Sequence, residues 1–347
     1  MEFAFSEEQQ ELAATVRSLL TKRADSRAVR AAVESDAGYD ESLWQTLCEQ
    51  IGAAALGIPE EYDGAGFSLF ESLIVLEEVG RSLAPSPLLA SLVAAETLLA
   101  TDDEDAKQRL LARIATGEVA TVAPISSVAL DGDALTGTAH RVLDGDRATV
   151  LLVAATSADG VALFEVDPAS VQRAWTPSMD QSVRLATLTF DGTPATRITG
   201  DAAAALERAE RVGAVGVAAM QAGCAARALE MTVAYTKERV QFGRPIGSFQ
   251  ALKHRMADML VLVEMSRSAS WAASYAVSTR ADNADQLAHV AKSYCSDALS
   301  HIAGETVQLH GGIAITWEHD AQLVFKRAHA LGQLFGQPHE HRALIEL

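Results

Sequence analysis

Three features are scarce in this 347-residue chain: cysteine, positive charge and long apolar runs. Its three cysteines, Cys48, Cys224 and Cys295, are widely spaced. Three cysteines cannot form a closed disulfide framework, and none has the spacing of a metal clip, so a reducing cytoplasm is the expected compartment. No apolar run has the length expected of a membrane span. The N-terminal stretch MEFAFSEEQQ also lacks the basic head and apolar run of a signal peptide.

The shortage of positive charge narrows the range of partners. Lysine and arginine number 28 against 46 aspartates and glutamates, which gives a formal net charge of −18. Nucleic acids and anionic membranes would be repelled by such a surface, so neither is expected as the main partner. Apolar residues make up 49% of the chain, which is enough for a large core and excludes global disorder.

Helical signals dominate the first part of the chain. Ser6 with Gln9, and Ser68 with Glu71, have the spacing of capping boxes that open helices. The stretch RSLAPSPLLAS predicts a break, because two prolines cannot lie inside one helix. This region therefore reads as a helical domain over residues 1–118.

The character changes after residue 118. Short β-rich runs, VLLVAAT, VALFEV and RLATLTF, are separated by turn sequences containing Asp and Gly. Long segments with helical periodicity return after residue 200. The predicted fold class is α+β: an N-terminal helical domain (1–118), a short β domain (119–200) and a C-terminal four-helix bundle (201–347).

The stretch RVQFGRPIGSFQ, residues 239–250, lies between two of these long helical segments. Glu238 is the single acid in a window that contains the basic residues Lys237, Arg239, Arg244, Lys253 and Arg255. Such a basic island in an acidic protein indicates a bound anion. A solvated corner between two helices with ordinary surface charges explains the same pattern equally well.

The details of this stretch fit an anion site. Gly243 and Gly247 around a proline predict a tight turn. Ser248 is placed to cap the following helix, whose free amides favour phosphate. Gln250 and Arg239 would add directional hydrogen-bond donors, and Phe242 a flat apolar surface.

A second feature is QLHGGIAITWEHD, which ends the third long helix. The paired glycines Gly311 and Gly312 would let a ligand approach the backbone closely, whereas a plain helix C-cap needs only one glycine. His310, beside them, could lie near a ligand or face the last carbonyls of the helix.

These residues carry a family resemblance. ERVQFGRPIGSFQALKHRMADM and QLHGGIAITWEHD, in this order, resemble the C-terminal signature of the acyl-CoA dehydrogenases. LGIPEEYDGAGFSLFESLIVLEEVGRSL resembles the helical domain of that family, and SMDQSVRLATLTFDGTP resembles the end of its β domain. The resemblance covers nearly the whole chain. It implies an acyl-CoA dehydrogenase-like fold and a FAD flavoprotein in which a carboxylate removes the α-proton of an acyl-CoA thioester while the β-hydride passes to the flavin.

The resemblance also implies site residues and partners. In the family's dimers, the motifs R-x-x-F-G and Q-x-x-G-G contact the ADP half of the neighbouring subunit's FAD. Carried onto this sequence, the motif positions are Arg239, Phe242, Gln308 and Gly312. Gln250 and Gly311, indicated by the turn and by the paired glycines, complete the cofactor-binding candidates. An electron-transfer flavoprotein is the expected electron acceptor.

The sequence departs from the family where the catalytic glutamate is expected. Family members carry this glutamate in one of two places, and counting from the neighbouring motifs puts Gly336 and Gly213 there. A glycine cannot act as a general base. Glu207 and Glu210, one or two turns from the second place, are the only weak substitutes. In the β domain, the run VAPISS keeps Pro124 but lacks the acidic and glycine elements of the family's flavin-facing segment.

This asymmetry resembles the depleted chain of the heteromeric α2β2 enzymes of actinobacterial steroid side-chain degradation. The leading prediction is a cytoplasmic subunit of such an acyl-CoA dehydrogenase, which completes FAD sites whose catalytic glutamate lies on the partner. Three alternatives stay open: a self-sufficient homomeric dehydrogenase with a relocated base, another flavin enzyme of this fold such as a monooxygenase, and a structural subunit without cofactor. No metal site is expected, and HEHR at residues 339–342 reads as solvated surface.

Overall fold

The computed structural model describes residues 5–124 and 127–346. Its contacts divide the chain into two compact units. Unit 1 consists of Met1–Val29, Leu73–Ala84 and Ala214–Leu347, and unit 2 of Arg30–Ser72 and Pro85–Gly213.

The helices of the described residues have ends at the predicted capping boxes and at the predicted proline break. They are α1 (Glu7–Arg23), α2 (Ser26–Glu34), α3 (Glu41–Thr46), α4 (Leu69–Ser82), α5 (Leu88–Leu99), α6 (Glu104–Ala115), α7 (Ala203–Glu238), α8 (Gln250–Ser278), α9 (Ala284–His310), α10 (Ala321–Gln333) and α11 (Pro338–Ala343). The capping box before α1 is confirmed, because the side chains of Ser6 and Gln9 each accept from the other's backbone N–H. At α4, the backbone N–H of Ser68 donates to Glu71 at 3.0 Å. The predicted proline break separates α4 from α5.

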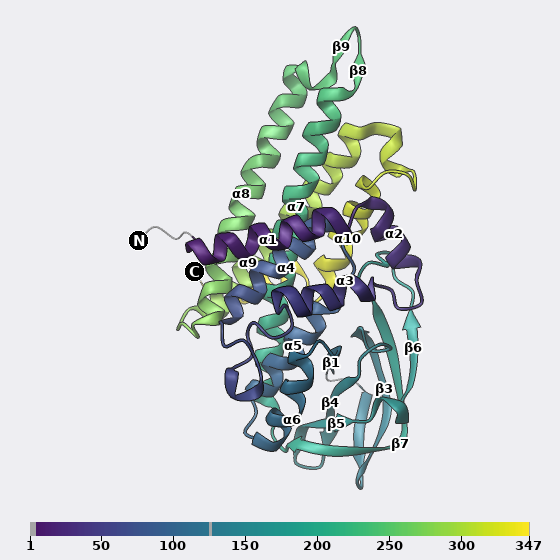
Figure 1. Ribbon diagram of the computed structural model, residues 1–347, viewed down its shortest axis with the longest axis vertical. Coiled ribbons are helices and arrows are strands. Elements are labelled where there is room, and N and C mark those ends of the chain that lie inside the picture. Colours follow the sequence, from purple (N-terminus) through teal and green to yellow (C-terminus); the bar gives the residue numbers. More distant parts are fainter. Residues whose placement is uncertain (1–4, 125–126, 347) are drawn as a thin grey trace. The chain divides into compact units, whose positions relative to one another are not determined.

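Unit 1 is built around long helices. Figure 1 shows α7 and α8 side by side, joined at one end by the short hairpin of β8 (Val240–Gln241) and β9 (Arg244–Pro245). α9 packs against α8, α10 and α11. The core of this bundle is apolar and includes Cys224, Met259, Val263, Leu299, Ile302, Val324 and Ala328.

Helix α7 is long and apolar enough, by length and composition, to cross a membrane. This differs from the expectation that no such run exists. Most of its apolar window is buried inside the structure. These side chains therefore serve as the core of a packed bundle.

Helices α4 and α7 approach each other closely through two glycines. A Cβ added to Gly80 would lie 2.2 Å from the carbonyl oxygen of Met220, and one added to Gly223 would lie 1.9 Å from that of Glu77. No side chain fits at these distances, so glycine is required at both crossings.

We expect Gly223→Ala to lower the free energy of unfolding by about 1–3 kcal/mol, because the helices must separate to admit a methyl group. Gly304→Ala in α9 is the matched control, since a Cβ there meets nothing within 4 Å. It should be neutral or stabilising by about 0.5–1 kcal/mol through helix propensity. Urea denaturation checks both variants, and equal effects would contradict the close-approach argument.

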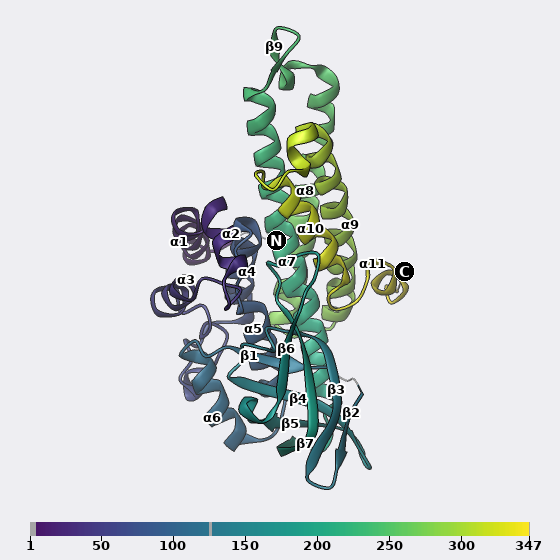
Figure 2. The ribbon, with the colours of Figure 1, turned by 90° about the vertical axis from the view of Figure 1, so that its right-hand side faces the viewer.

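Unit 2 contains a sheet that closes on itself. Its strands are β1 (Ala120–Ala123), β2 (Ser127–Asp131), β3 (Ala134–Leu143), β4 (Val150–Ser157), β5 (Gly160–Val166), β6 (Gln172–Thr176) and β7 (Leu185–Thr199). Pairing runs β4–β2–β3–β7–β5 and returns to β4, while β1 joins β4 and β6 joins β7 (Figure 2). The three predicted β-rich runs are confirmed as β4, β5 and the start of β7.

Two apolar clusters support unit 2. One fills the interior of the closed sheet and includes Val128, Leu135, Leu151, Phe164, Leu188 and Phe190. The other packs α5 and α6 against the sheet through Leu98, Leu110, Ile114, Leu152 and Leu163. In the run VAPISS, Pro124 follows β1, and residues 125–126 lie outside the described residues.

Candidate functional site

The turn between α7 and α8 is a two-residue β-hairpin. Val240 pairs with Pro245, and Gln241 with Arg244. Phe242 and Gly243 between them have φ values of 51° and 77°, the left-handed pair that such hairpins require. The predicted tight turn is confirmed. The predicted cap at Ser248 is wrong: its hydroxyl donates to the carbonyl of Pro245 at 2.7 Å, and α8 begins without a side-chain cap.

The basic island at this turn is smaller than the sequence indicates. Arg255 forms an ion pair with Glu305, with nitrogen–oxygen distances of 2.5 and 2.9 Å. Lys237, Arg239 and Lys253 are exposed, and their side chains form no hydrogen bond or ion pair with another described residue. The guanidinium of Arg244 lies 4.0 Å from the ring centroid of Phe249. Four cations therefore stay available to an anion from outside the chain.

Neighbouring side chains at the hairpin are also open to solvent. Phe242 is 92% exposed, an unusual state for a phenylalanine, and its ring meets that of Phe249 edge-on at 6.1 Å. Exposed Gln250 contacts the imidazole of His254 at 3.3 Å. The hairpin thus presents a flat apolar ring beside donors, which suits an aromatic ligand that carries phosphate.

The second half of the candidate site follows α9. Gly311 has φ 66° and ψ −146°, a conformation open essentially only to glycine. Gly311 and Gly312 are exposed, and a Cβ on either would meet nothing within 4 Å. Gln308 is exposed and has no partner among the described residues. The backbone here can be approached closely from outside.

His310 connects the two halves. Its Nδ1 lies 2.7 Å from the carbonyl oxygen of Thr306, so the helix-end interpretation is confirmed. The imidazole also stacks on Tyr235 of α7, with ring centroids 4.4 Å apart. Tyr235 lies one helical turn before Arg239, and His310 directly precedes Gly311. The stack of Tyr235 and His310 therefore links the hairpin half of the site to the glycine half.

Neither predicted place for a catalytic base carries a carboxylate. Gly336 has φ 90°, and a Cβ there would lie 2.7 Å from Nε2 of His341. Its carbonyl accepts a hydrogen bond of 2.8 Å from Lys292. The prediction that residues 339–342 are solvated surface is wrong for His341, which is buried. Its imidazole turns inward and contacts the carbonyl oxygen of Phe335 at 2.6 Å.

The sequence reasoning missed Lys292. This side chain is fully buried on α9, and burial lowers its pKa to about 8. Its ammonium contacts the carbonyls of Gly332 and Gly336 and the hydroxyl of Ser296. Its position within an apolar helical stretch of the sequence could have indicated that Lys292 is buried. The ammonium of Lys292 stabilises the turn after α10 through these two carbonyls.

The two weak substitutes differ in their surroundings. Glu207 is exposed and paired with Arg211 at 2.8 Å. Loss of hydration raises the pKa of Glu210, although its residue keeps contact with solvent. In the described ranges, no group of three His, Cys, Asp or Glu side chains is arranged to hold a metal ion.

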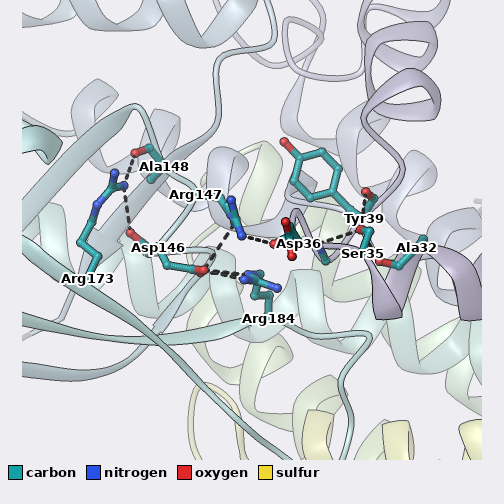
Figure 3. A network of polar contacts seen from close by, with 11 residues as sticks. Ala32, Ser35, Asp36, Tyr39, Asp146, Arg147, Ala148, Arg173 and Arg184 are labelled. Carbon is teal, nitrogen blue, oxygen red and sulfur yellow. Dashed lines mark hydrogen bonds and ion pairs between the residues drawn. The ribbon is translucent and has the colours of Figure 1, made fainter.

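The arginines around the β3–β4 turn of unit 2 are bound internally (Figure 3). Arg184 donates to the carboxylate of Asp146 at 2.6–3.0 Å. Arg147 donates to the carbonyl of Asp36, and Arg173 donates to that of Ala148 at 2.8 Å. These three guanidinium groups hydrogen-bond to other residues of the same chain, whereas that of Arg239 at the α7–α8 turn has no partner among the described residues.

Comparisons with known proteins agree with this architecture. Residues 6–118 match the acyl-CoA dehydrogenase N-terminal domain, and residues 203–346 match the acyl-CoA dehydrogenase C-terminal domain. Acyl-CoA dehydrogenase IpdE2 of Mycolicibacterium smegmatis is 43% identical over 353 residues, covering 98% of each chain. IpdE2 of Mycobacterium tuberculosis is 46% identical over 337 residues, covering 96% of this chain and 95% of the relative.

Two solved structures are similar over almost the whole chain. The Tcur3481–Tcur3483 steroid ACAD G363A variant has a TM-score of 0.88 at 31% identity, covering 98% of this chain and 96% of that one. The ChsE4–ChsE5 complex from Mycobacterium tuberculosis has a TM-score of 0.91 at 26% identity, covering 99% and 97%. The predicted fold class is confirmed. The chain belongs to the acyl-CoA dehydrogenase family of FAD-dependent oxidoreductases.

Proposed function

We propose that this chain is one subunit of a heteromeric α2β2 acyl-CoA dehydrogenase and completes a FAD site whose catalytic glutamate lies on a partner chain of the same family. The observation that carries the proposal is an asymmetry. The cations and glycines suited to hold an anion are exposed, and the side chains of Lys237, Arg239 and Lys253 have no ion-pair partner among the described residues, whereas the two places for the base hold Gly213 and Gly336. Half a binding site is useful only where a second chain supplies the rest.

The residues present fit the cofactor. Arg239 can hold a pyrophosphate with its planar fork of donors, and the open backbone at Gly311 and Gly312 can approach the same group. Phe242 offers a flat surface to an adenine ring, and Gln250 and Gln308 add amide donors. When bound, FAD accepts the hydride from the β-carbon of the acyl-CoA.

The solved relatives support a two-chain assembly and a steroid-derived substrate. Both similar structures carry the names of two chains, and one is named a steroid ACAD. We therefore propose a steroid side-chain acyl-CoA as substrate and an electron-transfer flavoprotein as acceptor. The cytoplasmic location and the domain boundaries after residues 118 and 200 stay predictions.

The test is flavin content per chain, measured by absorbance and native mass. The chain is expressed alone and together with a family member that keeps the glutamate. We expect a colourless or insoluble lone chain, and a yellow tetramer with one FAD per pair of unlike chains. One FAD per chain in a homomer would overturn the proposal.

The second candidate is a homomeric enzyme in which Glu210 is the base. The pKa of Glu210 is raised, and a carboxylate with a raised pKa is suited to proton transfer. That enzyme would bleach its own flavin with an acyl-CoA when expressed alone. A structural subunit without cofactor would leave flavin content unchanged on co-expression.

A further inference from the structure

Three aromatic rings meet where the two halves of the candidate site join. His310 stacks on Tyr235 at 4.4 Å with an interplanar angle of 28°. His319 meets His310 at 4.5 Å and Tyr235 edge-on at 6.2 Å. The rings come from the last turns of α7, the end of α9 and the segment before α10.

Two of the three rings lie next to residues of the site. Tyr235 precedes Arg239 by one helical turn, and His310 directly precedes Gly311. The imidazole of His319 accepts from the backbone N–H of Ala321 at 3.1 Å, which fixes this ring to the start of α10. A shift of Tyr235 relative to His310 would therefore change the spacing between Arg239 and the glycine turn.

The polar atoms of His310 require its neutral form. A carbonyl only accepts, so the contact with Thr306 places the proton on Nδ1. Nε2 is buried and has no hydrogen-bond partner in the described part of the chain. A proton on Nε2 would create a buried donor without an acceptor, which is costly.

We propose that neutral His310 is a positioning residue that holds Arg239 and the Gly311–Gly312 turn at the spacing needed to bind one anion. This rests on the proposed function for the identity of that anion, the pyrophosphate of FAD. The spacing itself is a property of this chain alone.

The surroundings of His310 determine how the stability of the three-ring stack changes with pH. The titratable side chains that contact it are Tyr235 of α7 and His319 before α10, and its own helix presents the backbone carbonyl of Thr306. Burial is the main cause that lowers the pKa of His310, His319 adds to it, and the bond to Thr306 opposes it. The unfolded chain thus binds the proton more readily. The stack is fully stable above the ordinary histidine pKa of about 6.5 and is weakened as pH falls below it.

The test compares His310→Phe, which keeps a ring but cannot titrate, with His310→Ala, which removes the ring. His301→Phe, at an exposed position of α9, is the matched control. Hydrogen exchange of residues 305–320 is measured on the co-expressed complex, freed of flavin, between pH 5.5 and 8. Comparing variants at one pH removes the intrinsic pH dependence of exchange.

We expect exchange in the wild type to become several-fold faster than in His310→Phe below pH 6, and His310→Ala to exchange several-fold faster at every pH. Unchanged exchange in His310→Ala, or the wild-type pH dependence in His310→Phe, would overturn the inference. If a variant does not fold, the wild type still decides once its exchange rates are divided by the intrinsic chemical rates at each pH: protection of residues 305–320 that does not fall below pH 6 is the contrary result. This readout needs no flavin, so it separates the role of His310 from the proposed FAD site, which flavin retention tests.

Discussion

The complex carrying Arg239→Ala should retain FAD about 10–100-fold less tightly than the wild type, because a charge-assisted hydrogen bond to phosphate contributes about 1.5–3 kcal/mol. Arg239 is exposed and unpaired within the described residues, so its removal breaks no internal contact. The fold should be unaffected. Flavin occupancy after gel filtration, with the melting temperature of the complex, measures both effects.

The matched control is Arg280→Ala, which removes the same charge just beyond the other end of α8. Arg280 is also exposed, and it has no partner in the part of the chain that the structure describes. A general loss of positive charge would weaken FAD retention equally in both variants. That result, or unchanged occupancy in Arg239→Ala, would exclude a specific contact between Arg239 and the cofactor.

Removing the carboxylate of Glu96 should destabilise unit 2 by about 3–5 kcal/mol, because it breaks a buried, hydrogen-bonded ion pair from one side. Arg208 donates to Glu96 through Nε and Nη2, at 2.8 and 2.6 Å. Both residues are buried, at 5% and 8% exposure. Glu96→Ala therefore removes both hydrogen bonds of the pair and the carboxylate that lies beside a buried positive charge. Thermal and urea denaturation measure the effect.

Two further variants separate charge from packing. Glu165→Ala breaks a surface pair with Arg109, whose side chain is 54% exposed, and should cost about 0–1 kcal/mol. The double variant Glu96→Leu, Arg208→Met replaces the buried pair with apolar side chains and should recover most of the stability lost in Glu96→Ala. A single variant no worse than Glu165→Ala would show that the buried pair is not needed.

Local signals in the sequence predicted the elements well. Ser6 with Gln9, and the prolines between α4 and α5, act on adjacent backbone groups, so short stretches of sequence contain the necessary information. The hairpin at Phe242 and Gly243 was predictable for the same reason. The glycines of the α9 terminus were identified because two adjacent glycines exceed what a helix C-cap needs, and the φ of 66° at Gly311 confirms that one of them is conformationally required.

Contacts between distant segments were not predictable in this way. Arg255 is paired with Glu305, fifty positions away, and nothing in the basic island indicates that partner. His341 lies in a polar sequence yet is buried, because the turn before α11 folds over it. Lys292 escaped notice because its partners are backbone carbonyls, which have no signature in the sequence.

The closed turn at Gly336 has a consequence for how such a chain can evolve. Its backbone has a φ of 90°, His341 occupies the space of a side chain, and Lys292 binds its carbonyl. Restoring a glutamate there would require a new backbone conformation and the displacement of the buried imidazole of His341. On the proposed function, dependence on the second chain is therefore entrenched: no single substitution at this position returns the subunit to independence, so the two genes must be kept together.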